Sequence, residues 1–335
     1  MPDTNRQLLL KSRPTGLVSR DNFDAVASPL PELRDGQALA RIRFLSVDPT
    51  MRIWMSDREG YLPPVALGEV MRALGIAEVI SSKHPEFKTG DLVFGMTGFQ
   101  EYVLLGAGEK VPFRKLPAIP GVPLTAFLGV LGITGITAYF GITDIARPQP
   151  GETLVVSAAA GATGSIAGQI GKILGCRVVG IAGGEEKCAW LTDELHFDAA
   201  INYKQSGWKE KLAAACPQGI DINYENVGGD IMNTVLSRMN LHGRVVLCGL
   251  ISGYNQEDPA LASFATVLIK RLRVQGFIVL DYAPRYGEAV AQLGQWLAAG
   301  KLKDRHTVVE GLDRAPDALA MLFTGQNIGK LIVRL

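Results

Sequence analysis

Residues 153–187 read TLVVSAAAGATGSIAGQIGKILGCRVVGIAGGEEK, and this stretch decides the fold. It opens with a β-branched apolar run at 153–157, passes through small residues, and then carries apolar side chains at helical spacing, at Ile166, Ile170 and Ile173. A second apolar run follows at 176–181. The order predicts strand, tight turn, helix and strand. Such a β-α-β unit requires a parallel strand pair and a right-handed crossover.

The turn of this unit has the small residues of a dinucleotide-binding loop. Ala159, Gly161 and Gly164 stand where that pattern needs a sharp turn, a close approach of backbone to pyrophosphate, and tight packing of helix on strand. The helix that begins near Gly161 would offer the N–H groups of Ala162 and Thr163 to phosphate. An ordinary glycine-rich turn is the alternative, because alanine replaces the first glycine. The position of the pattern between a strand and a helix favours cofactor binding.

Length and composition limit the classes of function. A chain of 335 residues is long enough for two domains, each with its own core. A net charge of +1 without a basic block argues against a nucleic-acid partner. The first residues do not resemble a signal peptide, and the cysteines at 176, 188, 216 and 248 lack the spacing of metal ligands. We therefore expect a cytoplasmic protein with reduced thiols.

Residues 116–143 contain no charged side chain, and on length alone they would span a bilayer. Prolines and glycines interrupt the stretch, from Pro117 to Gly141. We predict buried structure at the passage between two domains, and no membrane span.

The order of elements predicts an α/β protein with a doubly wound parallel sheet and a second, β-rich domain. Strand-like runs in the first domain lie at 7–11, 38–47, 76–81 and 92–105. The sheet is expected from strands at 153–157, 176–181, 199–203, 220–225, 244–250 and 273–280, with helices at 185–195, 208–215, 230–239 and 260–270. Further helices are expected at 287–299 and 315–323, and a last strand at 330–334. The expected domains are 1–122, 123–282, and a segment 283–335 that returns to the first domain.

Several motifs, in order along almost the whole chain, resemble one protein family. They read SVDPTMR, LGEVMR, KTGDLVFG, GITAYFGI, AAAGATGSIAGQIGK, GIAGGEEK, INYK, ENVGG, GLISGYN and GQNIGK. The set resembles the medium-chain dehydrogenase/reductases, in the zinc-independent branch of prostaglandin, alkenal and curcumin double-bond reductases. The resemblance implies a Rossmann domain that binds NADPH, a GroES-like catalytic domain, and a homodimer formed by strand pairing between cofactor domains.

No metal site is expected. Zinc-using relatives need thiolate and imidazole ligands from the first domain and a lobe with four cysteines. No cysteine precedes Cys176, and His84 is the only histidine in that half of the chain. His84 is more simply a loop residue.

The choice between NADH and NADPH depends on the end of the second strand. An enzyme for NADH places Asp or Glu there to bind the ribose hydroxyls. This chain has Gly183 in that region, which leaves room for a phosphate, and Lys187 follows in the first helical turn as a point charge. Either Glu185 or Glu186 as a ribose carboxylate is an alternative, and so is Lys187 as a solvated side chain. The resemblance assigns the 2′-phosphate to Lys187 and Tyr203, and we expect NADPH.

Further cofactor contacts are implied by the resemblance. Asn226 follows a strand end, where a turn cap is an equally good interpretation from sequence alone. The other implied contacts are Cys248, Gly249, Ile251, Ser252, Tyr254, Asn327 and a nicotinamide wall formed by Phe277, Ile278 and Val279.

Reduction of an activated double bond places charge on a carbonyl oxygen as hydride reaches the β-carbon, and a preorganised donor stabilises that charge. Tyr254 is the expected catalytic donor, together with the ribose 2′-hydroxyl; a packing role in a glycine-rich loop is the alternative. The final proton would come from water.

The substrate is expected to be a small hydrophobic enone or enal. Its wall would include Met51, Arg52, Trp54 and Tyr61 of the first domain and Phe264 of the second, although Trp54 also fits a core position. The chain departs from the family pattern at Thr50, Ala73, Leu74 and Thr134. These positions lie where substrate is expected, so the resemblance carries no prediction of substrate preference.

Two other functions fit the same cofactor residues. One is a zinc-free NADPH quinone reductase, and the other is an NADPH-binding protein without turnover. The joint presence of Lys187, Tyr203 and Tyr254 argues against the second.

Overall fold

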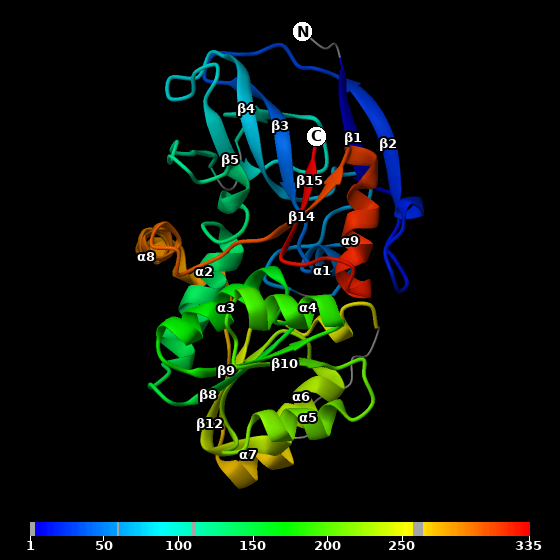
Figure 1. Cartoon of the computed structure of the whole chain (residues 1–335). Coiled ribbons are helices and arrows are strands. Elements are labelled where there is room, and N and C mark those ends of the chain that lie inside the picture. The colour runs from blue at the N-terminus through cyan, green and yellow to red at the C-terminus, as the bar shows by residue number, and fades with distance from the viewer. Residues whose placement is uncertain (1–3, 59, 109–111, 257–263) are drawn as a thin grey trace. The chain divides into compact units, whose positions relative to one another are not determined.

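A computed structural model describes residues 4–58, 60–108, 112–256 and 264–335. The chain forms two compact units (Figure 1). The first unit comprises Met1–Leu128, Thr307–Gln326 and Leu331–Leu335; the second comprises Gly129–His306 and Asn327–Lys330. Residues 283–306, which the sequence grouped with the returning segment, pack with the second unit.

The second unit contains a six-stranded parallel sheet with the strand order β10-β9-β8-β11-β12-β13. The strands are β8 (Thr153–Ser157), β9 (Arg177–Ala182), β10 (Ala199–Asn202), β11 (Ile220–Glu225), β12 (Met239–Leu247) and β13 (Arg273–Gly276). The order reverses at β8 and β11, where an open sheet of this kind binds its ligand. The predicted fold class is confirmed.

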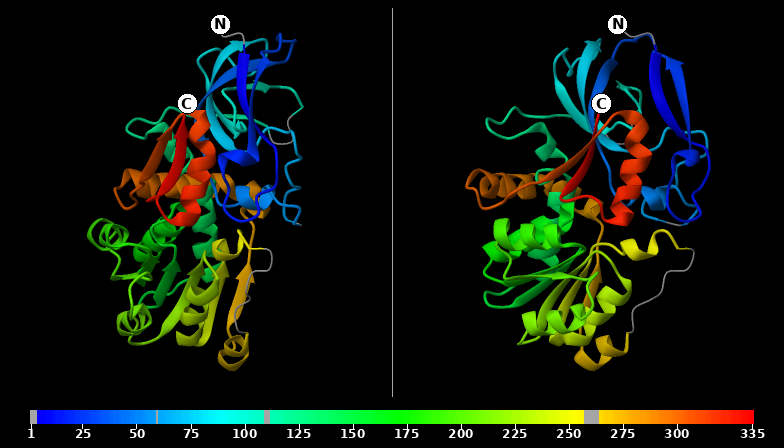
Figure 2. Two further views of the ribbon diagram at one scale, coloured as in Figure 1. Left: turned by 90° about the vertical axis from the view of Figure 1, so that its right-hand side faces the viewer. Right: turned by 45° about the vertical axis from the view of Figure 1, so that its right-hand side comes forward.

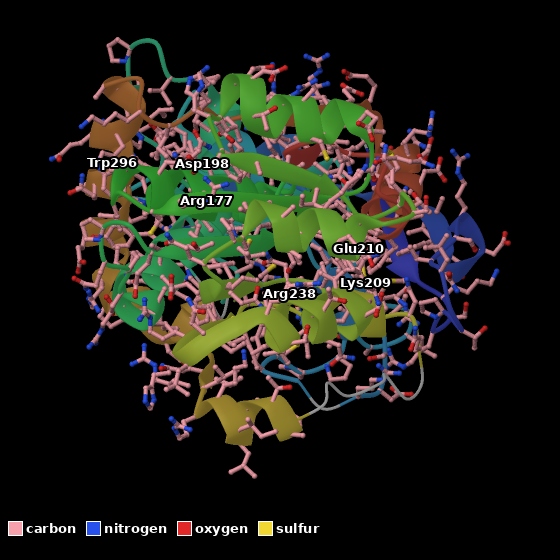
Figure 3. All side chains as sticks on the ribbon, turned by 60° about the horizontal axis from the view of Figure 1, so that its bottom comes forward. Arg177, Asp198, Lys209, Glu210, Arg238 and Trp296 are labelled. Carbon is pink, nitrogen blue, oxygen red and sulfur yellow. The ribbon has the colours of Figure 1, made fainter. Side chains whose placement is uncertain are left out.

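Helices cover both faces of this sheet. α3 (Ala162–Ile173) and α4 (Glu185–Ala189) lie on one face, and α5 (Trp208–Ala215) and α6 (Gly229–Arg238) on the other (Figures 1 and 2). α2 (Ile133–Phe140) packs beside α3, and α7 (Ala265–Lys270) packs on β12. The unit also holds α8 (Tyr286–Ala298), the π-helical turns η3 (Gly141–Ala146) and η4 (Trp190–Glu194), and the 3₁₀ turns η5 (Ile251–Gly253) and η6 (Val279–Arg285). Polar side chains such as Lys209 and Glu210 of α5 lie at the surface (Figure 3).

The β8-α3-β9 unit forms because its apolar residues all reach the interior. Leu154, Val155 and Val156 of β8 are fully buried, and so are Ile170 of α3 and Val179 of β9. Burial of each such aliphatic side chain contributes roughly 1.5–3 kcal/mol to folding. The apolar residues whose spacing predicted this segment are therefore the ones that pack in the interior.

The first unit is built mainly on antiparallel strands. A seven-stranded sheet has the order β14-β15-β3-β4-β5-β7, with β6 also paired to β3, and a separate ribbon joins β1 to β2. The strands are β1 (Thr4–Leu10), β2 (Phe23–Pro29), β3 (Ala38–Ser46), β4 (Leu74–Ser82), β5 (Leu92–Met96), β6 (Tyr102–Leu105), β7 (Arg114–Lys115), β14 (His306–Glu310) and β15 (Lys330–Arg334). The helical segments are α1 (Met51–Trp54), α9 (Ala315–Thr324) and the short turns η1 (Arg20–Asn22), η2 (Leu124–Phe127) and η7 (Leu312–Arg314).

Two predicted strands end earlier than expected, one because of its own sequence and one because of its neighbour in the sheet. The run 92–105 divides into β5 and β6, because Gly98 between them has a φ of 71°. The run 273–280 ends at Gly276, which pairs with Leu247, the last residue of β12. From Phe277 onward, β12 offers no further residue for strand pairing, and the chain continues into η6. The beginning of the helix expected at 260–270 lies outside the described residues.

Within the described parts of the chain, no helix is long and apolar enough to cross a membrane. The uncharged residues 116–143 contain η2, α2 and the start of η3, with Phe127 and Phe140 buried.

Candidate functional site

The turn after β8 leaves the start of α3 without a side-chain cap. Gly161 is the N-cap residue in an extended conformation, and Ala162 and Thr163, the first two helical residues, are partly exposed. Uncapped N–H groups at a helix start carry partial positive charge and attract anions. A Cβ on Gly164 would lie 2.5 Å from the carbonyl oxygen of Ala158, so only glycine allows this approach of helix to turn.

Backbone strain is concentrated at the same turn. Ala158 has a φ of 47°, in the left-handed region that residues with a Cβ seldom adopt. Ala159, the expected first small residue, is fully buried. A segment distant in sequence also binds this turn: the N–H of Gly329 donates to Ala160 O at 2.8 Å. Asn327 supports that segment by donating from Nδ2 to Gly329 O at 3.0 Å.

Tyr203 and Lys204 lie beside Gly183 at the end of β9, and Lys187 is near enough to Lys204 for the two charges to interact. A Cβ on Gly183 would meet Tyr203 Cε1 at 2.9 Å and Lys204 Cε at 3.0 Å. The pKa of Lys187 is lowered, first by burial and then by the positive charge of Lys204. Two ammonium groups close enough to repel form a natural site for a doubly charged anion. Lys204 is the member that the sequence interpretation missed.

The two glutamates at the start of α4 are bound to other side chains. Glu185 Oε1 accepts hydrogen bonds from Asn202 Nδ2 at 2.6 Å and from Gln205 Nε2 at 2.7 Å. Glu186 forms an ion pair with Arg305 at 3.3 Å. These partners reduce the case for either glutamate as a ribose carboxylate.

A buried carboxylate joins the ends of two neighbouring parallel strands. Glu225, fully buried at the end of β11, accepts hydrogen bonds at Oε1 from Ser157 Oγ (2.7 Å), from Val227 N–H (2.7 Å) and from Gly228 N–H (2.9 Å). Its Oε2 accepts from Asn223 Nδ2 at 2.9 Å. Such a network rigidifies the loop after β11, because all of these donors bind one carboxylate, that of Glu225.

Asn226 is fixed by the same strand ends. Its backbone N–H donates to Ser157 Oγ and its Nδ2 to Ser157 O, both at 2.7 Å. The amide therefore joins β11 to β8, which supports a structural role for this residue beside the expected cofactor contact.

The loop after β12 carries Tyr254 over the same edge of the sheet. The N–H groups of Cys248 and Gly249 donate to Glu225 O at 2.9 and 3.1 Å, and Ile251 N–H donates to Asn226 O at 3.1 Å. The Tyr254 hydroxyl accepts the N–H of Leu250 at 3.3 Å. A Cβ on Gly249 would lie 3.3 Å from that hydroxyl.

The remaining residues of this loop differ in exposure. Ser252 is exposed and donates from Oγ to Val227 O at 2.6 Å. Burial raises the pKa of the Cys248 thiol to about 11, and the Tyr224 hydroxyl that contacts it opposes the rise. Cys248 is therefore a neutral packing group at neutral pH. Phe277, Ile278 and Val279 follow β13 at this edge and are partly exposed.

The sequence matches known oxidoreductase families along both units. A family model described as the N-terminal domain of oxidoreductase matches residues 6–112, and one described as zinc-binding dehydrogenase matches residues 162–296. An NADPH-dependent curcumin reductase of Escherichia coli is 43% identical over 98% of this chain and 96% of its own. This chain belongs to the medium-chain dehydrogenase/reductase family. The predicted resemblance to its curcumin, alkenal and prostaglandin reductases is confirmed.

Two further members of this family show how closely the chain follows that branch. A 2-alkenal reductase (NADP(+)-dependent) of Nicotiana tabacum is 39% identical over 98% of this chain and 97% of its own. The crystal structure of CurA from Vibrio vulnificus in complex with NADPH has a TM-score of 0.92 at 45% identity, over 98% of each chain.

The family description for residues 162–296 names zinc binding. Within residues 4–58, 60–108, 112–256 and 264–335, no three or more His, Cys, Asp or Glu side chains form a group that could hold a metal ion.

The substrate residues expected for this reductase family differ in their surroundings. Met51 is fully buried in the core of the first unit, and Arg52 donates to the carbonyl oxygens of Pro14 (2.7 Å) and Gly16 (3.1 Å). Both therefore have structural roles, and their contact with substrate stays a prediction.

Tyr61 is the better candidate for a substrate wall, whereas Trp54 packs in the core of the first unit. Trp54 is 7% exposed, and its Nε1 has no hydrogen-bond partner among the described residues. Arg72 lies over its ring, 5.2 Å from the centroid. Tyr61 is 43% exposed, and its hydroxyl contacts the Thr50 hydroxyl. Thr50, a departure from the family pattern, therefore orients Tyr61. In the second unit, Phe264 is 57% exposed.

Two structural residues of this family member escaped the sequence analysis, Glu225 and Asn202. Asn202 Oδ1 accepts the N–H groups of Gly184 and Lys204, both at 3.1 Å, which orders the loop around the lysines. The available signal was position, since both residues lie at the carboxyl ends of strands.

Proposed function

We propose that this protein reduces the carbon–carbon double bond of α,β-unsaturated ketones and aldehydes with NADPH. The observation that carries the proposal is the pairing of an uncapped helix start with two neighbouring lysines, Lys187 and Lys204, near the end of the next strand. A dinucleotide with an additional phosphate needs both. The printed functions of the curcumin and alkenal reductases support the same reaction.

The residues fit the cofactor as follows. The N–H groups at 161–164 would bind the pyrophosphate, and Lys187, Lys204 and Tyr203 would bind the 2′-phosphate. The carboxyl edge formed by Asn226, the 248–254 loop and residues 277–279 would hold the nicotinamide half. Asn327, beside the phosphate turn, completes the set.

When bound, NADPH supplies the hydride. The chain must supply orientation and a donor for the substrate oxygen that gains charge. We assign that donor to Tyr254, with the ribose 2′-hydroxyl. The hydroxyl of Tyr254 accepts the Leu250 N–H, and a hydroxyl that accepts a hydrogen bond becomes a stronger donor. The first unit would be the catalytic domain, with Tyr61 toward substrate.

We also propose a cytoplasmic homodimer. The support for a dimer is β13, at the end of the strand order, next to α7, where Leu268 is 78% and Ile269 67% exposed. An exposed strand edge beside an apolar patch is a common pairing surface. Leu268→Glu should yield monomer by light scattering, whereas Leu67→Glu, at a side chain 55% exposed in the first unit, should not. The free cysteines 176, 188, 216 and 248 suit a reducing compartment.

The decisive assay follows NADPH absorbance with a panel of enones, enals and quinones, and repeats it with NADH. Oxidation with enones and enals, faster with NADPH, supports the proposal. Turnover of quinones alone would instead identify a quinone reductase. Tight NADPH binding without oxidation by any acceptor would identify a binding protein.

A further inference from the structure

An aromatic and cationic stack lies against the segment expected to form the nicotinamide wall. The Tyr282 ring stacks on Phe140 with centroids 4.4 Å apart, and it meets Phe277 edge-on at 6.3 Å. The guanidinium of Arg285 lies over both supporting rings, 4.8 Å from the Phe140 centroid and 6.0 Å from that of Tyr282. Phe277 therefore rests on a layer that is itself clamped by a cation.

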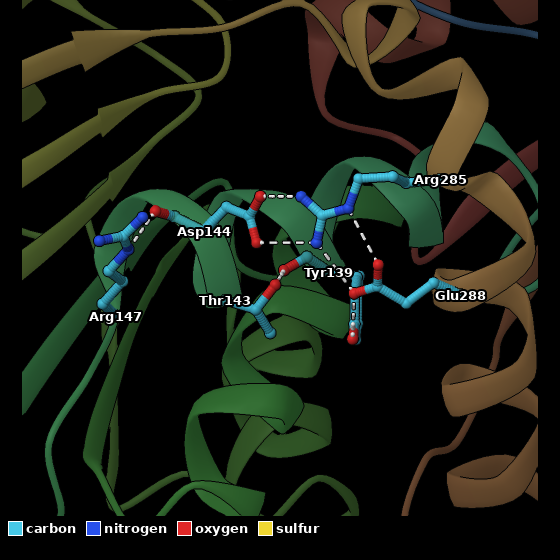
Figure 4. A network of polar contacts seen from close by, with 6 residues as sticks. All are labelled: Tyr139, Thr143, Asp144, Arg147, Arg285 and Glu288. Atoms are coloured by element: carbon cyan, nitrogen blue, oxygen red, sulfur yellow. Dashed lines mark hydrogen bonds and ion pairs between the residues drawn. The ribbon is translucent and has the colours of Figure 1, made fainter.

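Arg285 is fixed from two sides by carboxylates (Figure 4). It contacts Asp144 of η3 through both terminal nitrogens and Glu288 of α8 through Nε at 2.9 Å and Nη2 at 3.0 Å. Tyr139 of α2 donates to the same Glu288 at 3.2 Å. The network joins the end of α2 and the turn η3 to the start of α8.

Gly141 connects this stack to the other candidate cofactor segment. A Cβ there would lie 2.6 Å from Tyr224 Cε2 and 3.1 Å from Phe277 Cζ. Tyr224 is fully buried in β11 and contacts the thiol of Cys248. Gly141, at the start of the π-helical turn η3, therefore lies between Tyr224, which contacts Cys248, and Phe277, the first residue of the expected nicotinamide wall. Irregular helical turns of this kind recur at functional sites.

We propose that Gly141 and Arg285 are positioning residues that set the spacing of these two segments and so orient the nicotinamide ring. The inference rests on the proposed function. It assigns no contact with the cofactor to either residue. Because displacements of about 1 Å can reduce turnover by roughly a hundredfold, a single methyl at Gly141 is a sensitive probe.

The test distinguishes binding of the nicotinamide half of the cofactor from binding of the adenosine half. Gly141→Ala is compared with Gly287→Ala, a helical control whose Cβ would meet no atom of the described residues within 4 Å. Affinity is measured by calorimetry for NADPH and for adenosine 2′,5′-bisphosphate, which lacks the nicotinamide. We expect Gly141→Ala to weaken NADPH binding about tenfold and to leave the fragment unchanged, with a fall in kcat. The control should match the wild type in both.

A second pair of variants covers the case in which Gly141→Ala does not fold. Arg285→Met removes the ion pairs at a surface position, and Arg285→Lys restores charge. We expect the Met variant to weaken NADPH binding without affecting the fragment, and the Lys variant to recover part of the loss. Equal weakening of both ligands, or of neither, would overturn the inference. If the wild type itself fails to bind NADPH, the proposed function falls instead.

Discussion

Glu185 Oε1 lies 2.6 Å from Nδ2 of Asn202, which donates a hydrogen bond to it. This contact turns the first acidic side chain after β9 toward the end of β10. Lys204, beside Gly183, and Lys187, whose pKa its charge lowers, are then the two positive charges available to a phosphate. The selectivity proposed for NADPH follows from this division of roles.

Removal of either lysine should weaken the binding of NADPH and have little effect on the binding of NADH. We expect Lys187→Ala to raise KM for NADPH by roughly ten- to a hundredfold, since a charge-assisted contact contributes about 1.5–3 kcal/mol. Lys204→Ala should act in the same direction, and KM for NADH should change little in both. Lys209→Ala, which removes a surface ion pair with Asp230, is the control. An unchanged KM for NADPH in Lys187→Ala would remove the 2′-phosphate assignment.

Glu185→Gln provides the complementary measurement. Because its carboxylate already accepts bonds from Asn202 and Gln205, we expect the ratio of kcat/KM for NADPH to that for NADH to stay within about threefold of the wild type. A large loss confined to NADH would mean that Glu185 binds the ribose hydroxyls after all.

Tyr254→Phe should lower kcat on an enone by roughly ten- to a hundredfold, because it removes one preorganised donor, and should lower kcat more than it weakens NADPH binding. Stopped-flow absorbance of a single turnover measures the chemical step directly. Tyr203→Phe is the matched control on the cofactor side, and it should affect KM for NADPH more than kcat. Full single-turnover rates in Tyr254→Phe would exclude the hydroxyl as the donor.

Glu225 permits a graded test of the buried network. Glu225→Ala leaves the hydroxyl of Ser157 and the N–H groups of Val227 and Gly228 without their acceptor, at about 1–3 kcal/mol for each unsatisfied group. Glu225→Gln should recover much of this, because Oδ1 of Asn223 is buried with no hydrogen-bond partner in the part of the chain that the structure describes, and it can accept from the new amide after rotation. Urea unfolding measures the stability, with exposed Glu210→Ala as the control. Equal losses in the Ala and Gln variants would contradict this reading.

Buried thiols should make the protein less stable at high pH. Burial raises the pKa of Cys176 and Cys216 from an ordinary value of 9.0 to about 11. Below pH 9 both states keep these protons; between about 9 and 11 the unfolded chain releases them while the folded chain does not, so unfolding becomes more favourable as pH rises. Urea midpoints across this window should fall less steeply in Cys176→Ala/Cys216→Ala than in the wild type. Identical slopes would mean that these thiols do not contribute.

The sequence predicted the elements whose signals are local. β8, the turn and α3 follow from an apolar run, small residues and a helical period that persist in the packed structure. β13 ended early because its length depends on the end of β12, a neighbour in the sheet and not in the local sequence. Pattern alone did not contain that information.

The candidate site was predictable to a similar degree. Lys187 stands in a recognisable motif, whereas the importance of Lys204 depends on the approach of β10 to Gly183. Glu225 ends the strand expected at 220–225, and because glutamate is mostly exposed, the local sequence does not show that the neighbouring strands bury it. Met51 shows the reverse case, since a residue assigned to a substrate wall packs in a core.

The contact from Gly329 to Ala160 has a consequence for protein synthesis. Gly329 has a φ of 66°, and a Cβ there would lie 2.6 Å from the carbonyl carbon of Arg305, so this position accepts only glycine. During translation, the strained turn at Ala158 is made about 170 residues before the segment that braces it. A nascent chain arrested shortly before Gly329 should therefore hold the sheet but leave the turn more open to a protease than in the finished molecule.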